Sequence, residues 1–81
     1  NIYPNPNKGI LKIRFNSPDE RKVTVKMYDV VGRLAETIFD GKAKIGMNEF
    51  LVMPEDLAAG VYFVRLESPG YEKTEKIILL Q

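Results

Sequence analysis

The chain has 81 residues, of which 44% are hydrophobic and 28% charged, so it is long enough for one small domain and too short for two. It contains no cysteine and no histidine, which excludes disulfides and argues against most metal-dependent and hydrolytic enzymes, because histidine is the commonest metal ligand and proton carrier near neutral pH. Its formal net charge of +1 is too small for the overall field to hold nucleic acid or an anionic membrane.

The sequence has no segment resembling a transmembrane helix, which needs about 18 or more consecutive apolar residues. Residues 1–6 lack the charged region followed by an apolar stretch that marks a signal peptide. We therefore expect the chain to be part of a longer protein and not to insert into a membrane.

The first two expected strands, near 11–15 and 22–27, carry apolar residues at every second position. This alternation is typical of strands with one buried face and one face in water. Turn-forming residues at 16–20 separate the two strands. The apolar set is Leu11, Ile13, Phe15, Val23, Val25 and Met27.

A tight turn at 29–33, with Gly32 at a position suited to a positive φ, leads to a third strand near 34–39. Alternation does not settle which face of that strand is buried. Asp40-Gly41 is expected to end it as a turn. A fourth strand carries Phe50 and Val52 on one face and ends at 54–56.

Leu57, Gly60 and Tyr62 precede a fifth strand with the spacing of a tyrosine corner, in which a buried tyrosine hydroxyl donates to a backbone carbonyl a few residues upstream. The alternative is a tyrosine that only packs. Ser68-Pro69-Gly70 predicts a type II turn before a last strand near 73–80. Together these elements predict an all-β, immunoglobulin-like Greek-key β-sandwich of about seven short antiparallel strands.

The last strand is unusual because 77–80 is apolar at all four positions. It is either central in its sheet and covered on both faces, or exposed on one face and available to another protein. The sequence leaves both interpretations open.

Candidate chemistry is sparse, so we expect neither an enzyme nor a bound cofactor or metal. Acidic turn residues could bind calcium, although they lack the dense spacing of a dedicated loop; they are Asp29, Asp40, Glu55 and Asp56. Basic residues on strands could form a face for anionic polysaccharide or lipid, or simply keep the sheets soluble; they are Lys12, Arg14, Lys22, Lys26, Arg65, Lys73 and Lys76. Nothing in the pattern favours nucleic-acid binding.

Four motifs in chain order resemble the C-terminal sorting domain of type IX secretion cargo. They are Tyr3-Pro4-Asn5-Pro6 with Gly9, Tyr28-Asp29 followed by Gly32-Arg33, the Leu57, Gly60 and Tyr62 corner, and the closing Lys76-Ile77-Ile78-Leu79-Leu80. The resemblance covers nearly the whole chain. Phe50 departs from this resemblance, since many relatives carry a larger aromatic or an aliphatic residue there. The departure affects the packing more than it affects the assignment to the family.

The resemblance implies a signal that directs a larger cargo through the outer-membrane type IX translocon. Cleavage by a sortase-like peptidase and attachment of the cargo at the surface would follow. The protein would then be secreted, transiently periplasmic, and finally at the cell surface or extracellular. Residues 1–9 would enter from the upstream cargo and residues 10–81 would form the sandwich. The resemblance assigns recognition to Lys73, Lys76, Ile77, Ile78, Leu79 and Leu80, and a scaffold role to the other motif residues.

A second interpretation is a structural or adhesive module of fibronectin or immunoglobulin type, appended to a surface protein or enzyme. The Tyr-Asp-x-x-Gly-Arg hairpin also occurs in such sandwiches, so it does not distinguish this interpretation from the sorting domain. A cargo-export experiment distinguishes the two.

Overall fold

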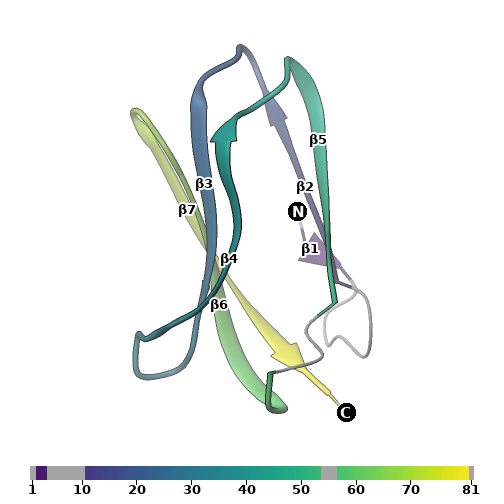
Figure 1. Ribbon diagram of the computed structural model, residues 1–81, viewed down its shortest axis with the longest axis vertical. Helices are drawn as coiled ribbons and strands as arrows, with labels where there is room; N and C mark the ends of the chain where they lie inside the picture. The colour runs from purple at the N-terminus through teal and green to yellow at the C-terminus, as the bar shows by residue number, and fades with distance from the viewer. Residues whose placement is uncertain (1, 4–10, 54–56, 81) are drawn as a thin grey trace.

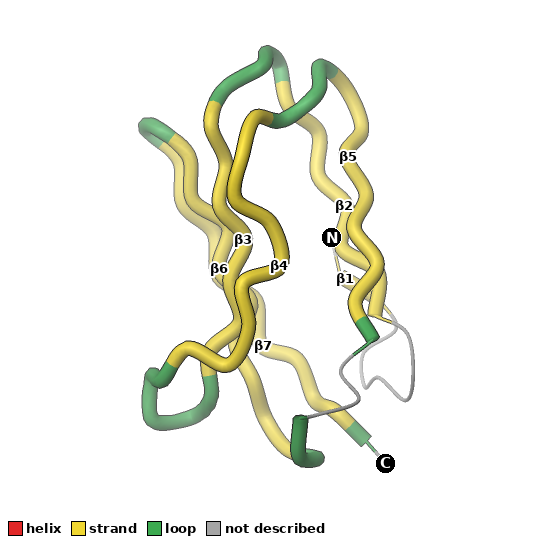
Figure 2. Tube along the Cα trace, viewed as in Figure 1, coloured by secondary structure: helices red, strands yellow, loops and turns green. Residues whose placement is uncertain are grey.

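The computed structural model of the protein describes residues 2–3, 11–53 and 57–80, and for 2–3 the backbone alone. All regular structure in these ranges is β-strand (Figure 2), and none of it is a helix that could cross a membrane. The strands are β1 (Ile2–Tyr3), β2 (Leu11–Ser17), β3 (Lys22–Tyr28), β4 (Leu34–Lys42), β5 (Gly46–Val52), β6 (Gly60–Ser68) and β7 (Tyr71–Leu79).

Two antiparallel sheets pack face to face (Figure 1), one with the order β1-β2-β5 and the other with the order β4-β3-β6-β7. The chain changes sheet after β2, after β4 and after β5, while β3–β4 and β6–β7 are hairpins within one sheet. This is the predicted immunoglobulin-like Greek-key sandwich.

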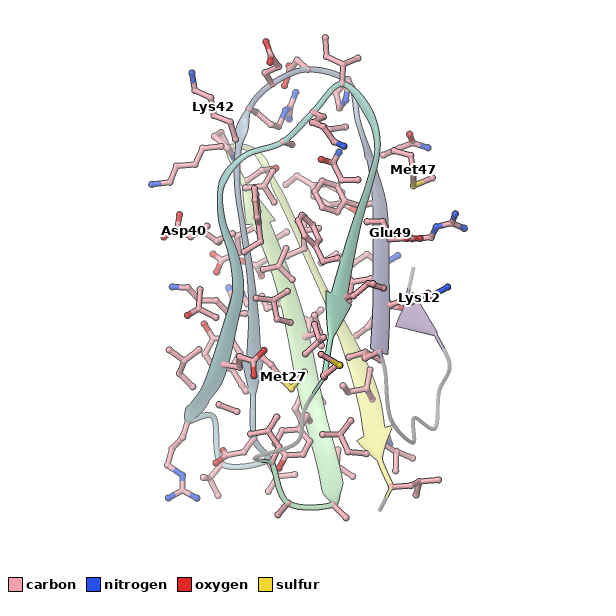
Figure 3. All side chains as sticks on the ribbon, turned by 45° about the vertical axis from the view of Figure 1, so that its right-hand side comes forward. Lys12, Met27, Asp40, Lys42, Met47 and Glu49 are labelled. Atoms are coloured by element: carbon pink, nitrogen blue, oxygen red, sulfur yellow. The ribbon has the colours of Figure 1, made fainter. Side chains whose placement is uncertain are left out.

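The core lies between the sheets and follows the alternation in the sequence. The apolar positions predicted for β2, β3 and β6 point inward, and Met27 lies between the two sheets in Figure 3. Each buried aliphatic side chain stabilises the fold by about 1.5–3 kcal/mol relative to its exposed state. The buried core comprises Leu11, Ile13, Val23, Val25, Met27, Ala43, Val52, Tyr62, Val64, Ile77 and Leu79.

Phe50 belongs to an aromatic group that packs against this core. Its ring lies 5.8 Å from the Phe15 ring and 4.6 Å from the Phe39 ring, centroid to centroid. Such separations are typical of favourable aromatic pairs. The three rings therefore link the two sheets through β2, β5 and β4.

The prediction that Asp40-Gly41 ends the third strand as a turn is wrong. β4 continues to Lys42, and Gly41 lies opposite Val23 within the ladder. The ring of Phe39 lies over Gly41, where an added Cβ would come within 3.3 Å of it. Gly41 therefore makes room for an aromatic side chain and does not reverse the chain.

Register shifts in the β3–β4 ladder explain why alternation could not assign the faces of β4. The shifts fall between Val25 and Lys26 and between Met27 and Tyr28. At each shift β4 contributes one extra residue, which changes which side of the strand faces the core. Both Ile38 and Phe39 pack against the core as a result.

The hairpin expected at 68–70 is present, since Ser68 lies opposite Tyr71 and Gly70 has a φ of +74°. That φ suits the second central position of a type II turn. The last strand begins at Tyr71, two residues before its predicted start. The predicted stop of the fourth strand at 54–56 lies outside the described residues.

Candidate functional site

Five of the six residues assigned to recognition lie on β7, and the sixth, Leu80, follows it directly. β7 lies at the edge of its sheet (Figure 1). It pairs with β6 along its whole length, and among the described residues no strand pairs with its other edge. Ile77 and Leu79 are buried in the core, whereas Ile78 and Leu80 are 36% and 46% exposed. Of the two open interpretations, the exposed edge strand is therefore correct.

The six residues divide between the two faces of β7. Lys73, Ile77 and Leu79 face the other sheet, and directly opposite them on β6 lie Leu66, Tyr62 and Gly60. Lys76, Ile78 and Leu80 are all exposed, and Lys76 and Ile78 lie on the outer face of the sheet, opposite Phe63 and Val61. Ile77 and Leu79 are buried and cannot contact a partner without opening the core, whereas the outer set and the exposed Lys73 can.

The corner residues hold the inner set in place. The Tyr62 hydroxyl donates to the Ala58 carbonyl oxygen at 2.7 Å, which confirms the tyrosine corner. Leu57 packs against the core, and Gly60 has a φ of +150°, which favours glycine. Because Tyr62 lies opposite Ile77, the corner and the tail form one structural unit.

The second scaffold motif is a turn built around the Asp29 carboxylate. Asp29 Oδ1 accepts the backbone N–H groups of Val31 at 3.0 Å and Arg33 at 2.9 Å, and Oδ2 accepts Arg33 Nε at 2.9 Å. Two backbone hydrogen bonds between 29 and 33 close the loop, and Gly32 has a φ of +85°. The motif is therefore a self-contained turn in which both oxygens of the Asp29 carboxylate are bonded within the turn. Tyr28 ends β3 on the outer face, opposite Phe63.

Stability should depend on pH through Asp29. The Arg33 N–H, followed by the Arg33 side chain and the Val31 N–H, lowers the pKa of Asp29 below its ordinary value of 3.8, although partial burial opposes this. The charged carboxylate therefore favours the folded state above that pH, and this contribution disappears as the pH falls through the folded-state pKa.

We expect Asp29→Asn to lower the melting temperature at pH 7, and the difference from the unsubstituted protein to shrink between about pH 5 and pH 2. The melting temperatures of both proteins are measured across that pH range by monitoring thermal unfolding with circular dichroism. Asp40→Asn is the control, since Asp40 lies 4.0 Å from the exposed Lys22 ammonium and holds no turn together. A difference for Asp29→Asn that stays constant with pH would contradict this origin.

An open cleft of about 620 Å³ separates the sheets at the end that carries the β6–β7 hairpin tip, and the sequence reasoning missed it. In Figure 1 that tip stands away from β2 and β5. Its floor includes Ile13, Val25 and Leu66, and its rim includes Lys73 and Glu75. The sequence held the signal, because the alternation that buries Ile77 also turns Lys73 and Glu75 inward, where charged side chains cannot close a core.

The basic residues do not gather on one face. Lys12 and Arg14 lie on β2, and Lys12 and Glu49 point away from the other sheet in Figure 3. Carboxylates are interspersed with the bases: Arg14 contacts Glu49 at 2.9 Å, and Arg65 contacts Glu67 and Glu72. This arrangement fits charged faces that keep the sheets soluble.

The calcium alternative gains no support from the described ranges, in which no three histidine, cysteine or acidic residues come together. Asp29 is occupied by its own turn, and Glu55 and Asp56 lie outside those ranges. The same holds for Pro4, Asn5, Pro6 and Gly9 of the first motif, whereas the Tyr3 backbone pairs with Lys12 as part of β1.

Comparison with known families decides between the two overall interpretations. The family model described as the secretion system C-terminal sorting domain matches residues 1–80. The chain belongs to this family. It is a type IX secretion C-terminal sorting signal, and membership implies a parent chain with a cargo, the type IX machinery, and secretion.

The sorting domain matches no curated protein and no solved structure. The domain family is generally non-catalytic, in keeping with the expectation from the histidine-free composition.

Proposed function

We propose that the sorting domain is recognised in its folded form by the outer-membrane type IX translocon, and that the exposed half of β7 is the part in contact. Export is then followed by cleavage of the domain by a sortase-like peptidase and by attachment of the cargo at the cell surface. Residues 1–9 connect the cargo to the sandwich of residues 10–81.

The supporting observation is the division of the tail between its two faces. Ile77 and Leu79 anchor β7 in the core, while Ile78 and Leu80 remain exposed on an edge strand. Large exposed apolar side chains on a strand at the edge of a sheet are a usual feature of protein docking sites. The rigid scaffold fixes their position, so a receptor meets the same arrangement in every copy.

A reporter fused in front of the sorting domain, expressed in a cell with the type IX apparatus, tests the proposal. The double variant Ile78→Ser, Leu80→Ser removes the exposed apolar groups and leaves the core intact. The matched control is Met47→Ser, Leu51→Ser, because these large apolar residues on the other sheet are somewhat more exposed than the tail pair, at 49% and 61%.

We expect the tail variant to reduce the secreted fraction about tenfold or more, and the control to leave it within about twofold, since loss of one hot-spot contact commonly costs over 1 kcal/mol. Cleavage would shorten the secreted fusion by up to the 9.2 kDa of the domain, which an immunoblot resolves. Retention of the unsubstituted fusion in the periplasm would refute a role in sorting, and unchanged export of the tail variant would refute the role of β7.

A further inference from the structure

The three-stranded sheet is incomplete at one end. β1 is two residues long, and among the described residues its pairing with β2 ends where Ile2 lies opposite Ile13. β2 itself continues to Ser17, and on its other side it pairs with β5 along its whole length. In the part of the chain that the structure describes, no strand pairs with 15–17 on the side of β1. Figure 1 shows β1 beside the lower part of β2 only.

The cleft between the sheets opens beside this part of β2. Residues 15–17 line it on one side, and Lys73 and Glu75 of β7 line it on the other. Its floor is apolar and includes Val25 and Leu66. Because charged side chains stand at the rim, the two sheets cannot close over this floor by themselves. A strand added beside 15–17 covers the floor and forms backbone hydrogen bonds with β2.

The end of β2 is held in place without such a strand. The Ser17 hydroxyl donates to the Asp19 carbonyl oxygen at 2.7 Å, and Ser17 lies opposite Gly46 in the ladder with β5. Ser17 is also buried, at 6% exposure. The edge is therefore preformed, and a strand that pairs with it does not have to order it first.

The register of β1 identifies the segment that can occupy this place. In an antiparallel pair, each step toward the N terminus of one strand moves its partner one residue further along the other. The residue directly before Asn1 is thus aligned with Phe15, the second before it with Asn16, and the third before it with Ser17. The family is a C-terminal sorting domain with a cargo-carrying parent chain, so the cargo precedes Asn1.

We infer that the segment of the parent chain directly before Asn1 extends β1 along β2 and covers the cleft. The inference rests on the part of the proposed function in which residues 1–9 connect the cargo to the sandwich. Because the segment is continuous with β1, its local concentration at the edge of β2 is on the order of millimolar. It therefore competes effectively with a strand of any other protein for this edge.

The arrangement specifies the chemistry of the upstream residues. Directly opposite residues share a face of the sheet. Phe15 packs against the core, so the residue directly before Asn1 turns toward the apolar floor and is expected to be apolar. Asn16 is exposed, so the second residue before Asn1 faces water. A peptidase that cuts within this segment must first detach it from β2, because proteolysis acts on exposed, unpaired chain.

Cross-linking in the cysteine-free domain tests this arrangement. The protein is a fusion of a cysteine-free reporter, the parent's own residues that precede Asn1, and the sorting domain. Asn16→Cys is combined with a cysteine at the first, second or third residue before Asn1, in three separate variants. The second residue lies opposite Asn16, where Cα atoms are about 4.5–5.5 Å apart and within the range of a disulfide. The first and third point to the other face and are the matched controls.

Under mild oxidation we expect the disulfide with the second residue to form about tenfold faster or more than with either control. Equal rates for all three variants would show a flexible tether and would overturn the inference, leaving the edge to a strand of another protein. Thermal unfolding of each reduced fusion verifies that the domain remains folded.

Hydrogen exchange of the unsubstituted fusion provides a second measurement. Backbone amides of the upstream segment that pair with β2 should exchange about tenfold more slowly or less than in the urea-unfolded chain. Exchange of the whole segment at the unfolded rate would contradict the added strand. Both measurements use purified protein without the type IX apparatus, so this inference can fail while the sorting role stands, and the reverse.

Discussion

Replacing Tyr62 with alanine should lower the free energy of unfolding by about 3–5 kcal/mol, a large part of the 4–12 kcal/mol or so expected for a domain of this length. The ring is buried opposite Ile77, and the hydroxyl bonds Ala58 across the corner. The substitution therefore removes core contacts and the tie between the β5–β6 connection and the sheet at once.

Urea unfolding measures this effect as a shift of the midpoint at constant slope. Tyr62→Phe, which keeps the ring, should cost only about 1 kcal/mol for the lost hydrogen bond. Tyr71→Ala is the control, because Tyr71 is 52% exposed beside the hairpin turn, and it should cost about 0.5 kcal/mol or less. A midpoint shift for Tyr62→Ala as small as that of Tyr71→Ala would show that the corner does not hold the fold.

Adjacent isoleucines of the tail should respond in opposite ways to the same substitution. Ile77→Ala should reduce the free energy of unfolding by about 2–5 kcal/mol, because Ile77 is fully buried and the alanine leaves a cavity. Ile78→Ala should change it by less than about 1 kcal/mol, because the side chain is on the outer face. Each variant is the control of the other, since residue type and strand are the same.

Urea unfolding compares the free energies of unfolding of the two variants, and the reporter fusion compares their secreted fractions. Under conditions where both variants stay folded, Ile78→Ala should be the poorer export signal despite being the more stable protein. If export instead follows stability in both, the tail acts only through folding, and the outer face has no separate part in recognition.

Local alternation was sufficient to predict the strands that make up the core. In β2, β3 and β6 each side chain lies on the face that its position in the alternation assigns, because regular pairing preserves a two-residue period. The corner was also predictable, since the spacing of Leu57, Gly60 and Tyr62 is local. Such features depend on neighbours a few residues away.

The remaining features depend on which strands become neighbours. The two register shifts in β4 arise from its pairing with β3. Asp40-Gly41 has the composition of a turn, but Gly41 continues the strand and accommodates the Phe39 ring, which the local sequence does not show. The edge position of β7 follows from the order of the sheet. On the outer face of the four-stranded sheet, the row of Leu34, Tyr28, Phe63 and Lys76 takes one residue from each of four strands, so no window of the sequence contains it.

The position of β7 at the end of its sheet, where β6 is its paired neighbour among the described strands, has a mechanical consequence. Its hydrogen bonds to β6 form a ladder that closes at the hairpin turn, with Gly60 opposite Leu79 at the open end and Ser68 opposite Tyr71 at the closed end. A pull on the C-terminal end loads the rungs of this ladder one after another, so the strand peels away at low force instead of shearing as a whole. Peeling would uncover Leu79 and Ile77 first, while the β3–β4 hairpin and the three-stranded sheet stay intact.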